Sequence, residues 1–213
     1  MIKIYGPPFS QRVQKALMSA SAVGLEFESV PVNLFEGENR EGWYVALHPA
    51  SKVPVIDDDG FVLFESNAIM KYLCRKAGSA LYPPDVEGQA RVDQWCDFVT
   101  LHIDIHVSSL AYNKIIAPKI GVPVDEFALE ERPAFLDRFL TVIDKQLSNF
   151  RYLAGSELTI ADIGLLASMG VLDQVDFSIE KWGHIVRWRE ELRAQAFYRR
   201  VMELQQDVAA AGP

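Results

Sequence analysis

The sequence has 213 residues, of which 49% are hydrophobic and 23% are charged, with a formal net charge of −8. This composition is typical of a globular protein whose chain can bury a sizeable core, as one large domain or two small ones. The negative charge argues against nucleic acid or an anionic membrane as the main partner, because binding phosphates requires a basic surface.

Three further features of the sequence bear on the compartment in which the protein works. The first residues, Met1–Gly6, lack the apolar core of a secretory signal, and no apolar run is long enough to span a bilayer. The two cysteines, Cys74 and Cys96, form neither a CxxC motif nor a metal-type spacing. We therefore expect a cytoplasmic protein without structural disulfides.

The first elements in the chain are a strand, a helix and a strand. Residues 2–5 alternate as a strand does, and Gly6-Pro7-Pro8 ends it. A helical pattern begins after Ser10, which is a good N-cap residue, and ends at Gly24. A second strand is expected over residues 27–32, so this stretch forms a βαβ unit.

A polar connector over residues 33–47, which ends in a short apolar segment, leads to a predicted hairpin. Apolar runs at 53–56 and 61–64 flank Asp59-Gly60, a preferred centre of a two-residue turn. Because neither run alternates with polar residues, we expect the sheet to be covered on both faces. Pro54 cannot donate a ladder hydrogen bond, which indicates a strand start, an edge or a cis peptide.

A helix is predicted from Ser66, as its N-cap, to Gly78. Its exposed N–H groups form an anion site, and Glu65 beside it would attract a cation. The pair suits a ligand end that carries both charges, such as an α-amino acid. The alternative is a capped helix with an acidic first turn.

Beyond a proline-containing linker at residues 79–85 the periodicity is wholly helical. One stripe runs from Val92 to Ile103 in a helix that ends before Pro118, and a second runs over residues 136–147, with Pro133 expected only in a first turn or at a break. Thr159 and Asp162 resemble a capping box and should serve as a structural cap for a buried helix. Two further helices are expected over residues 182–192 and 197–204.

The element order of the first half is thioredoxin-like, and three of its segments resemble one family. They are residues 6–17 (Gly-Pro-Pro-Phe-Ser-Gln-Arg-Val-Gln-Lys-Ala-Leu), 49–55 (Pro-Ala-Ser-Lys-Val-Pro-Val) and 63–69 (Leu-Phe-Glu-Ser-Asn-Ala-Ile). In this order and spacing they look like the N-terminal domain of the cytosolic glutathione S-transferases. The resemblance covers nearly the whole chain and leans towards serine-type classes such as theta and phi or a bacterial type. Residues 150–155 (Phe-Arg-Tyr-Leu-Ala-Gly) extend the similarity to phi enzymes.

The resemblance implies an α/β thioredoxin-like domain with a mixed sheet, followed by an all-α domain. We expect a glutathione-binding domain over residues 1–78, a linker over 79–86 and a helical domain over 87–213 that contributes the hydrophobic substrate pocket. The family also implies a homodimer.

The same resemblance places glutathione along the first domain. Pro54 should be cis, so that the Val53 backbone pairs antiparallel with the cysteinyl part of the ligand. Glu65 and Ser66 should hold the γ-glutamyl end, and three residues should face the glycine carboxylate, although solvated surface charge is an equal alternative for Arg40. These three residues are Asn39, Arg40 and Lys52.

Ser10 carries the chemistry in this interpretation. A thiol with a pKa of about 8.5 is mostly protonated at neutral pH, and only the thiolate is a good nucleophile. The Ser10 hydroxyl can donate a hydrogen bond to that thiolate at a helix start. Ser10 as a plain N-cap is the alternative, and Tyr5 is the competing hydroxyl, for which we favour a packing role.

The hydrophobic substrate should be lined by Phe9, Phe35, His106, Tyr112 and Ile115. For Tyr112 and Ile115 core packing is at least as good an interpretation. His102 and His106 lie four residues apart on a helix, but a third ligand is lacking nearby, so we expect no metal.

The sequence therefore predicts a detoxifying glutathione transferase that attaches the thiolate of its co-substrate glutathione to a hydrophobic electrophile. A glutathione-dependent isomerase or dehalogenase, and a non-catalytic binding or interaction protein of the same fold, are the alternatives.

Overall fold

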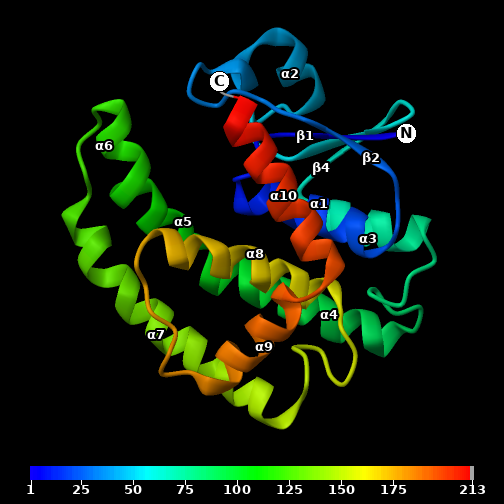
Figure 1. The fold of residues 1–213 in the computed structure, drawn as a ribbon, viewed down its shortest axis with the longest axis vertical. Coiled ribbons are helices and arrows are strands. Elements are labelled where there is room, and N and C mark those ends of the chain that lie inside the picture. The colour runs from blue at the N-terminus through cyan, green and yellow to red at the C-terminus, as the bar shows by residue number, and fades with distance from the viewer. Residues whose placement is uncertain (212–213) are drawn as a thin grey trace. The chain divides into compact units, whose positions relative to one another are not determined.

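The computed structural model describes residues 1–211 and divides them into two compact units. The first unit joins residues 1–83 to the chain from Arg193 onward, and the second spans Pro84–Leu192. Figure 1 shows the mixed sheet of the first unit and the helices of the second. The predicted boundaries of the functional domains stay a prediction, and the last two residues of the predicted helical domain lie outside the described residues.

A four-stranded mixed sheet forms the centre of the first unit. Its strands are β1 (Ile2–Tyr5), β2 (Phe27–Val30), β3 (Val55–Asp58) and β4 (Phe61–Phe64), in the order β2-β1-β3-β4. β1 runs parallel to β2 and antiparallel to β3, which pairs antiparallel with β4. The predicted thioredoxin-like sheet is therefore confirmed.

Two details of the hairpin differ from the prediction. β3 begins at Val55 rather than at Val53, because Pro54 has no N–H to give to the ladder. The Val53–Pro54 peptide is cis. The expectation of a sheet covered on both faces fails at the edge strand β4, where Phe61, Val62 and Phe64 are exposed in the isolated chain.

Helices α1 (Gln11–Ala22) and α3 (Ser66–Lys76) pack against each other and against the sheet. The predicted apolar stripe of α1 is buried, and that of α3 is buried at Ile69 and Leu73. The last helix, α10 (Ala196–Ala211), packs on α1, where Gln14 Nε2 donates a hydrogen bond of 3.0 Å to Gln205 Oε1. Figure 1 shows this helix in red crossing α1.

A smaller layer lies beside the sheet at the connector. It contains a single 3₁₀ turn, Glu38–Arg40, and the short helix α2 (Gly42–Leu47). The side chain of Tyr44 in α2 is fully buried and forms a cluster with Val32 and Val55, against which Tyr5 and Val53 also pack.

The second unit is helical throughout its regular structure. α4 (Val86–Val99), α5 (Ile105–Ala111) and α6 (Ala117–Ile120) follow one another through two π-helical turns, Thr100–Asp104 and Tyr112–Ile116. The other helices are α7 (Glu126–Asn149), α8 (Ile160–Gln174) and α9 (Gly183–Arg193). Among the described residues, none of these helices is both long enough and apolar enough to cross a membrane.

The expectation for Pro133 was wrong, because this residue lies inside α7 and beyond its first turn. Pro removes the N–H that would bond to the carbonyl four residues earlier. The helix continues because a buried stripe on both sides of Pro133 packs it against α5. The stripe consists of Ala128, Leu136, Leu140, Ile143 and Leu147.

The centre of the second unit is α8, most of which is buried. It begins with a capping box at Thr159 and Asp162. The fully buried carboxylate of Asp162 accepts four hydrogen bonds: from the Thr159 N–H and hydroxyl at 3.0 Å each, from Leu153 N–H at 2.9 Å and from Trp188 Nε1 at 3.0 Å. One side chain thus joins the helix start to the preceding loop and to α9.

Burial raises the pKa of Asp162 from its ordinary value of 3.8 to about 6, although the four donors favour the charged form. A native pKa above the unfolded one means that the folded protein binds the extra proton. This contribution to stability is complete below the unfolded pKa and is lost as the pH rises through 6.

We therefore predict that the wild-type protein loses about 2–3 kcal/mol of unfolding free energy relative to Asp162→Asn between pH 4 and pH 7. Urea unfolding of both proteins across this range measures the difference. Asp173→Asn, which changes an exposed carboxylate on the same helix that pairs with Arg189, is the control variant. A wild-type advantage that grows with pH would mean that the four donors outweigh burial.

Candidate functional site

The loop between β1 and α1 holds Ser10 at the helix start. Ser10 N–H donates to Pro7 O at 3.0 Å, and Ser10 O accepts the Gln14 N–H at 2.9 Å. The residue is half-buried and occupies the N-cap position, but within the described residues its side chain makes no capping hydrogen bond. The hydroxyl at this positive end of the helix is therefore not occupied by the capping role.

Tyr5, the competing hydroxyl, ends β1 and faces the connector. Its ring lies 6.2 Å from that of Trp43, measured between centroids, and it packs on the cluster around Tyr44. The packing role favoured for Tyr5 agrees with these contacts.

The segment before the cis peptide is held by two side chains of the connector. Asn39 Nδ2 donates to Ser51 O at 2.7 Å, and Tyr44 Oη donates to Lys52 O at 2.7 Å. Ser51 has a positive φ of 53°, which is unusual for a residue with a side chain. Burial raises the pKa of Tyr44 far above its ordinary value, so its hydroxyl keeps the proton that it donates.

The Ser10 loop and the Val53 segment lie in close contact at Gly6. Gly6 has a φ of 138°, and a Cβ placed on it would lie 2.6 Å from Val13 Cγ2 and 3.1 Å from Val53 Cβ. Only glycine fits this backbone and this space. The loop that carries Ser10 and the segment predicted to pair with a cysteinyl main chain are thus neighbours.

Glu65 and Ser66 lie at the start of α3, which begins one residue earlier than predicted. Glu65, not Ser66, is the N-cap residue, and Ser66 is the first residue of the helix. Glu65 has a φ of 71° and an exposed side chain, and its carbonyl accepts the Ile69 N–H at 2.9 Å. An acid beside a helix N-terminus fits the predicted site for a group that carries both charges.

His48 lies close to this charged region. It is buried and stacks on Phe64 with 4.5 Å between ring centroids, and its Nδ1 accepts the Ala50 N–H at 3.2 Å. Burial lowers the pKa of His48, the charge of Glu65 opposes that effect, and Lys52 adds to it. His48 therefore carries no charge into the site at neutral pH.

The residues predicted for the glycine carboxylate differ in their surroundings. Arg40 and Lys52 are exposed, as solvated cations are, whereas Asn39 is half-buried and donates to the main chain at Ser51. The two cations thus keep their heads in solvent, while the Asn39 amide nitrogen already has a partner.

The candidates for the hydrophobic substrate fall in both units. In the first, Phe9 and Phe35 are 46% and 57% exposed, and their ring centroids lie 6.4 Å apart. In the second, Tyr112 is exposed and Ile115 is half-buried in a π-helical turn, whereas His106 is buried.

His106 belongs to a stack of rings between α5 and α7. It lies parallel to Phe135 at 4.9 Å between centroids, and His102 lies 4.7 Å from Phe139 in the same stack. Burial lowers the pKa of His106, and the charges of Arg132 and His102 lower it further. The described residues contain no group of three or more His, Cys, Asp or Glu side chains arranged to hold a metal ion.

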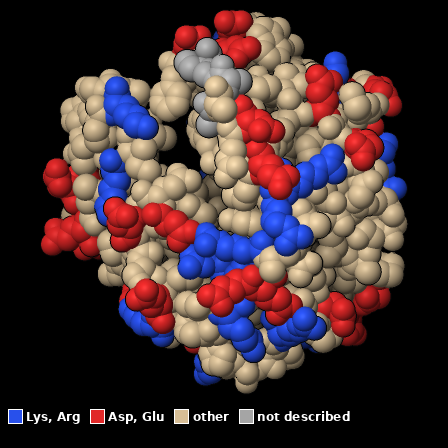
Figure 2. Space-filling view, viewed as in Figure 1, with Lys and Arg blue, Asp and Glu red and all other residues tan. Residues whose placement is uncertain are grey.

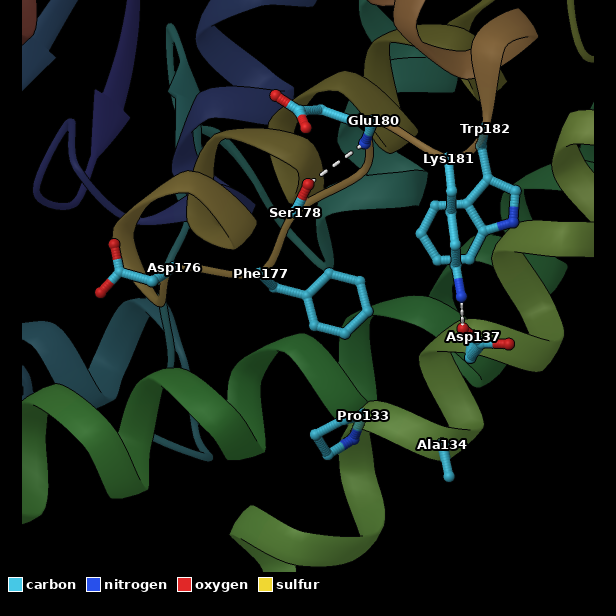
Figure 3. Close-up of a pocket in the computed structure, with 9 residues that line it drawn as sticks. All are labelled: Pro133, Ala134, Asp137, Asp176, Phe177, Ser178, Glu180, Lys181 and Trp182. Atoms are coloured by element: carbon cyan, nitrogen blue, oxygen red, sulfur yellow. Dashed lines mark hydrogen bonds and ion pairs between the residues drawn. The ribbon is translucent and has the colours of Figure 1, made fainter.

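An open pocket of about 730 Å³ lies elsewhere in the second unit, between α7 and the loop before α9 (Figure 3). Phe177 and Trp182 stack in it, and Lys181 lies over the Trp182 ring and pairs with Asp137. The pocket contains none of the residues predicted for the site.

The chain is similar to known proteins over nearly its whole length. Residues 1–75 match the family model "Glutathione S-transferase, N-terminal domain", and residues 108–196 match "Glutathione S-transferase, C-terminal domain". Glutathione S-transferase F12 of Arabidopsis thaliana is 31% identical over 210 residues, which cover 96% of this chain and 98% of that protein. The chain belongs to the glutathione S-transferase family.

Solved structures agree with this assignment. Glutathione transferase F2 from Populus trichocarpa has a TM-score of 0.90 at 26% identity, over 97% of this glutathione transferase and all of that chain. Glutathione S-transferase I from maize, in complex with an atrazine glutathione conjugate, has a TM-score of 0.87 at 25% identity, over 96% and 98% of the two chains. The plant relatives are of the serine-type phi class, which confirms the predicted lean towards serine-type enzymes.

Sequence reasoning missed two residues that shape the site of this transferase, Tyr44 and His48. Both lie in or next to the short apolar segment at residues 43–47, whose pattern indicates only a packed element. A buried tyrosine usually finds a hydrogen-bond partner, which is the one signal the sequence offered.

We predict that Gly6→Ala destabilises this transferase by about 2–4 kcal/mol, from backbone strain and from the contacts of the added Cβ. Chemical denaturation measures the loss. Gly24→Ala is the control, because Gly24 also has a positive φ but a Cβ there meets nothing within 4 Å. Equal losses in the two variants would contradict a close contact between the loops.

Proposed function

We propose that this glutathione transferase attaches the thiolate of glutathione to an electrophilic carbon of a hydrophobic compound, and that Ser10 stabilises the thiolate. The glutathione thiol loses its proton to solvent, and the sulfur forms a bond to carbon as the electrophile accepts the electron pair or releases a leaving group. The observation that carries the proposal is the Ser10 hydroxyl at the start of α1, which is not used as a cap.

The energy required is modest. Lowering a thiol pKa by about two units requires about 2.7 kcal/mol of preferential stabilisation of the thiolate. One hydrogen bond to a charged sulfur and the positive end of a helix dipole can supply it together. The maize relative in complex with an atrazine glutathione conjugate supports conjugation as the reaction.

We place glutathione along the first unit. The N-terminus of α3 holds the γ-glutamyl carboxylate, and Glu65 holds the ammonium group. The Val53 main chain pairs with the cysteinyl residue, with Pro54 fixing the turn beside it. Lys52 and Arg40 attract the glycine carboxylate from solvent, with Asn39 near them, and Phe9 and Phe35 offer an exposed aromatic pair to the electrophile.

We further propose that the protein acts as a homodimer in the cytoplasm. Three apolar side chains of the edge strand β4 are exposed in the isolated chain, and such patches are where partners bind. Cys74 and Cys96 are buried and neither is part of a disulfide, which suits a reducing compartment in which glutathione is a thiol. On the face drawn in Figure 2, acidic and basic side chains are interspersed.

We predict that Ser10→Ala lowers kcat by tenfold or more, while the affinity for glutathione changes little, because a hydrogen bond to a charged group contributes about 1.5–3 kcal/mol. The ultraviolet titration of the bound thiolate should move to higher pH. Tyr5→Phe, which removes the other hydroxyl and keeps the packed ring, should titrate as the wild type does. The reverse pattern would transfer the role to Tyr5.

We also predict that Glu65→Ala weakens glutathione binding by about 1.5–3 kcal/mol, the contribution of a charged hydrogen bond. Its unfolding free energy should fall by only about 0.3–1 kcal/mol, because the acid is exposed at a helix start. Calorimetric titration and urea unfolding measure the two quantities. Glu41→Ala, which changes an exposed acid at the N-cap of α2, should bind glutathione like the wild type, and a Glu65 variant that does so would refute the placement.

A further inference from the structure

Two successive carbonyls before Val53 are each held by a side chain from the connector. Tyr44 Oη donates to Lys52 O, and Asn39 Nδ2 donates to Ser51 O, both at 2.7 Å. Neither carbonyl is needed to build a helix or a strand, because β3 begins only at Val55. The two bonds therefore fix an irregular segment that the sheet does not fix.

The geometry of the peptide group links the direction of each held carbonyl to the direction of the next N–H. In a planar trans peptide the C=O of one residue and the N–H of the next point to opposite sides. Among the described residues the only cis peptide is the next one, Val53–Pro54. A hydrogen bond that holds Lys52 O towards Tyr44 therefore turns the Val53 N–H to the opposite side, and Asn39 fixes the preceding peptide in the same way.

We propose that Tyr44 and Asn39 are positioning residues for glutathione, which set the direction of the Val53 N–H that donates to the cysteinyl carbonyl. This inference rests on the proposed function, in which the Val53 main chain pairs with the cysteinyl residue. Neither side chain touches the ligand. Each acts through the peptide that it holds.

The ring and the hydroxyl of Tyr44 have different roles. The ring is fully buried among Val32 and Val55, a place that phenylalanine would fill equally well. A buried hydroxyl is costly unless it has a hydrogen-bond partner, and this partner is the Lys52 carbonyl. The hydroxyl therefore orients the segment, while the ring supplies the packing.

The experiment compares wild type, Tyr44→Phe and Tyr152→Phe by calorimetric titration with two probes. The first probe is glutathione. The second is γ-glutamylcysteamine, which keeps the γ-glutamyl group, the amide N–H and the thiol but lacks the cysteinyl carbonyl. Tyr152→Phe removes a hydroxyl that donates to Glu191 at 2.7 Å in the second unit, so it is a matched control.

Tyr44→Phe should raise the Kd for glutathione about tenfold, the cost of one hydrogen bond that is no longer aligned. The Kd for γ-glutamylcysteamine should not change, since the acceptor is absent. KM for glutathione should rise with kcat within about twofold, and the titration of the bound thiol should stay in place, because Ser10 is untouched. The control variant should match the wild type throughout.

Two results would overturn the role of Tyr44. One is an unchanged affinity for glutathione, and the other is an equal loss with both probes, which would mean general loosening of the site. A wild-type protein that binds neither probe contradicts the proposed function itself. Thermal unfolding of each variant ensures that all titrations use native protein.

Asn39 is tested with a third probe, γ-glutamylcysteine, which lacks the glycine. If Asn39 orients the peptide, Asn39→Ala should weaken this probe and glutathione by the same factor. A loss confined to glutathione would instead mean that Asn39 contacts the glycine carboxylate, and it would overturn the positioning role of this residue.

Discussion

The close contact between the Ser10 loop and the Val53 segment is the constraint on which the candidate site depends. A glycine at position 6 lets the two loops approach to a distance that any Cβ would prevent. One loop carries the hydroxyl proposed for the sulfur, and the other carries the main chain proposed for the residue that bears the sulfur. The Ser10 loop follows β1 and the Val53 segment precedes β3. Because β1 and β3 are paired in the sheet, the register of this pair sets the spacing of the two loops.

Much of the fold could be predicted because its signals are local. Alternation at residues 2–5, helical periodicity after Ser10 and the turn at Asp59-Gly60 each predict an element that the structure contains. The failures concern features that depend on tertiary context. Pro133 is tolerated inside α7 because the stripe on both sides of it packs. The β4 side chains stay partly exposed although α2 and α3 contact that strand.

The candidate site also combines residues that the sequence predicted with residues that it did not. Ser10 and the Glu65-Ser66 pair were expected at two helix starts and lie there, although Glu65 and not Ser66 is the N-cap. Val53 and Pro54 were expected at the start of a strand, but β3 begins only at Val55. The roles of Tyr44 and His48 did not follow, since a hydrogen bond to a carbonyl eight residues away leaves no periodic pattern. The sequence likewise does not show that the Asn39 amide reaches the Ser51 carbonyl, and its place near the glycine carboxylate stays a prediction.

The position of α10 has a consequence for how the protein is made. Helix α1, which begins directly after Ser10, is covered by α10, and Gln14 and Gln205 are 191 residues apart in sequence. During synthesis the sheet and α1 leave the ribosome long before α10 exists, so one face of α1 has no covering helix while the whole second unit is being translated. The first unit to begin is thus the last to be completed, and such long-range closure is slow compared with local helix formation.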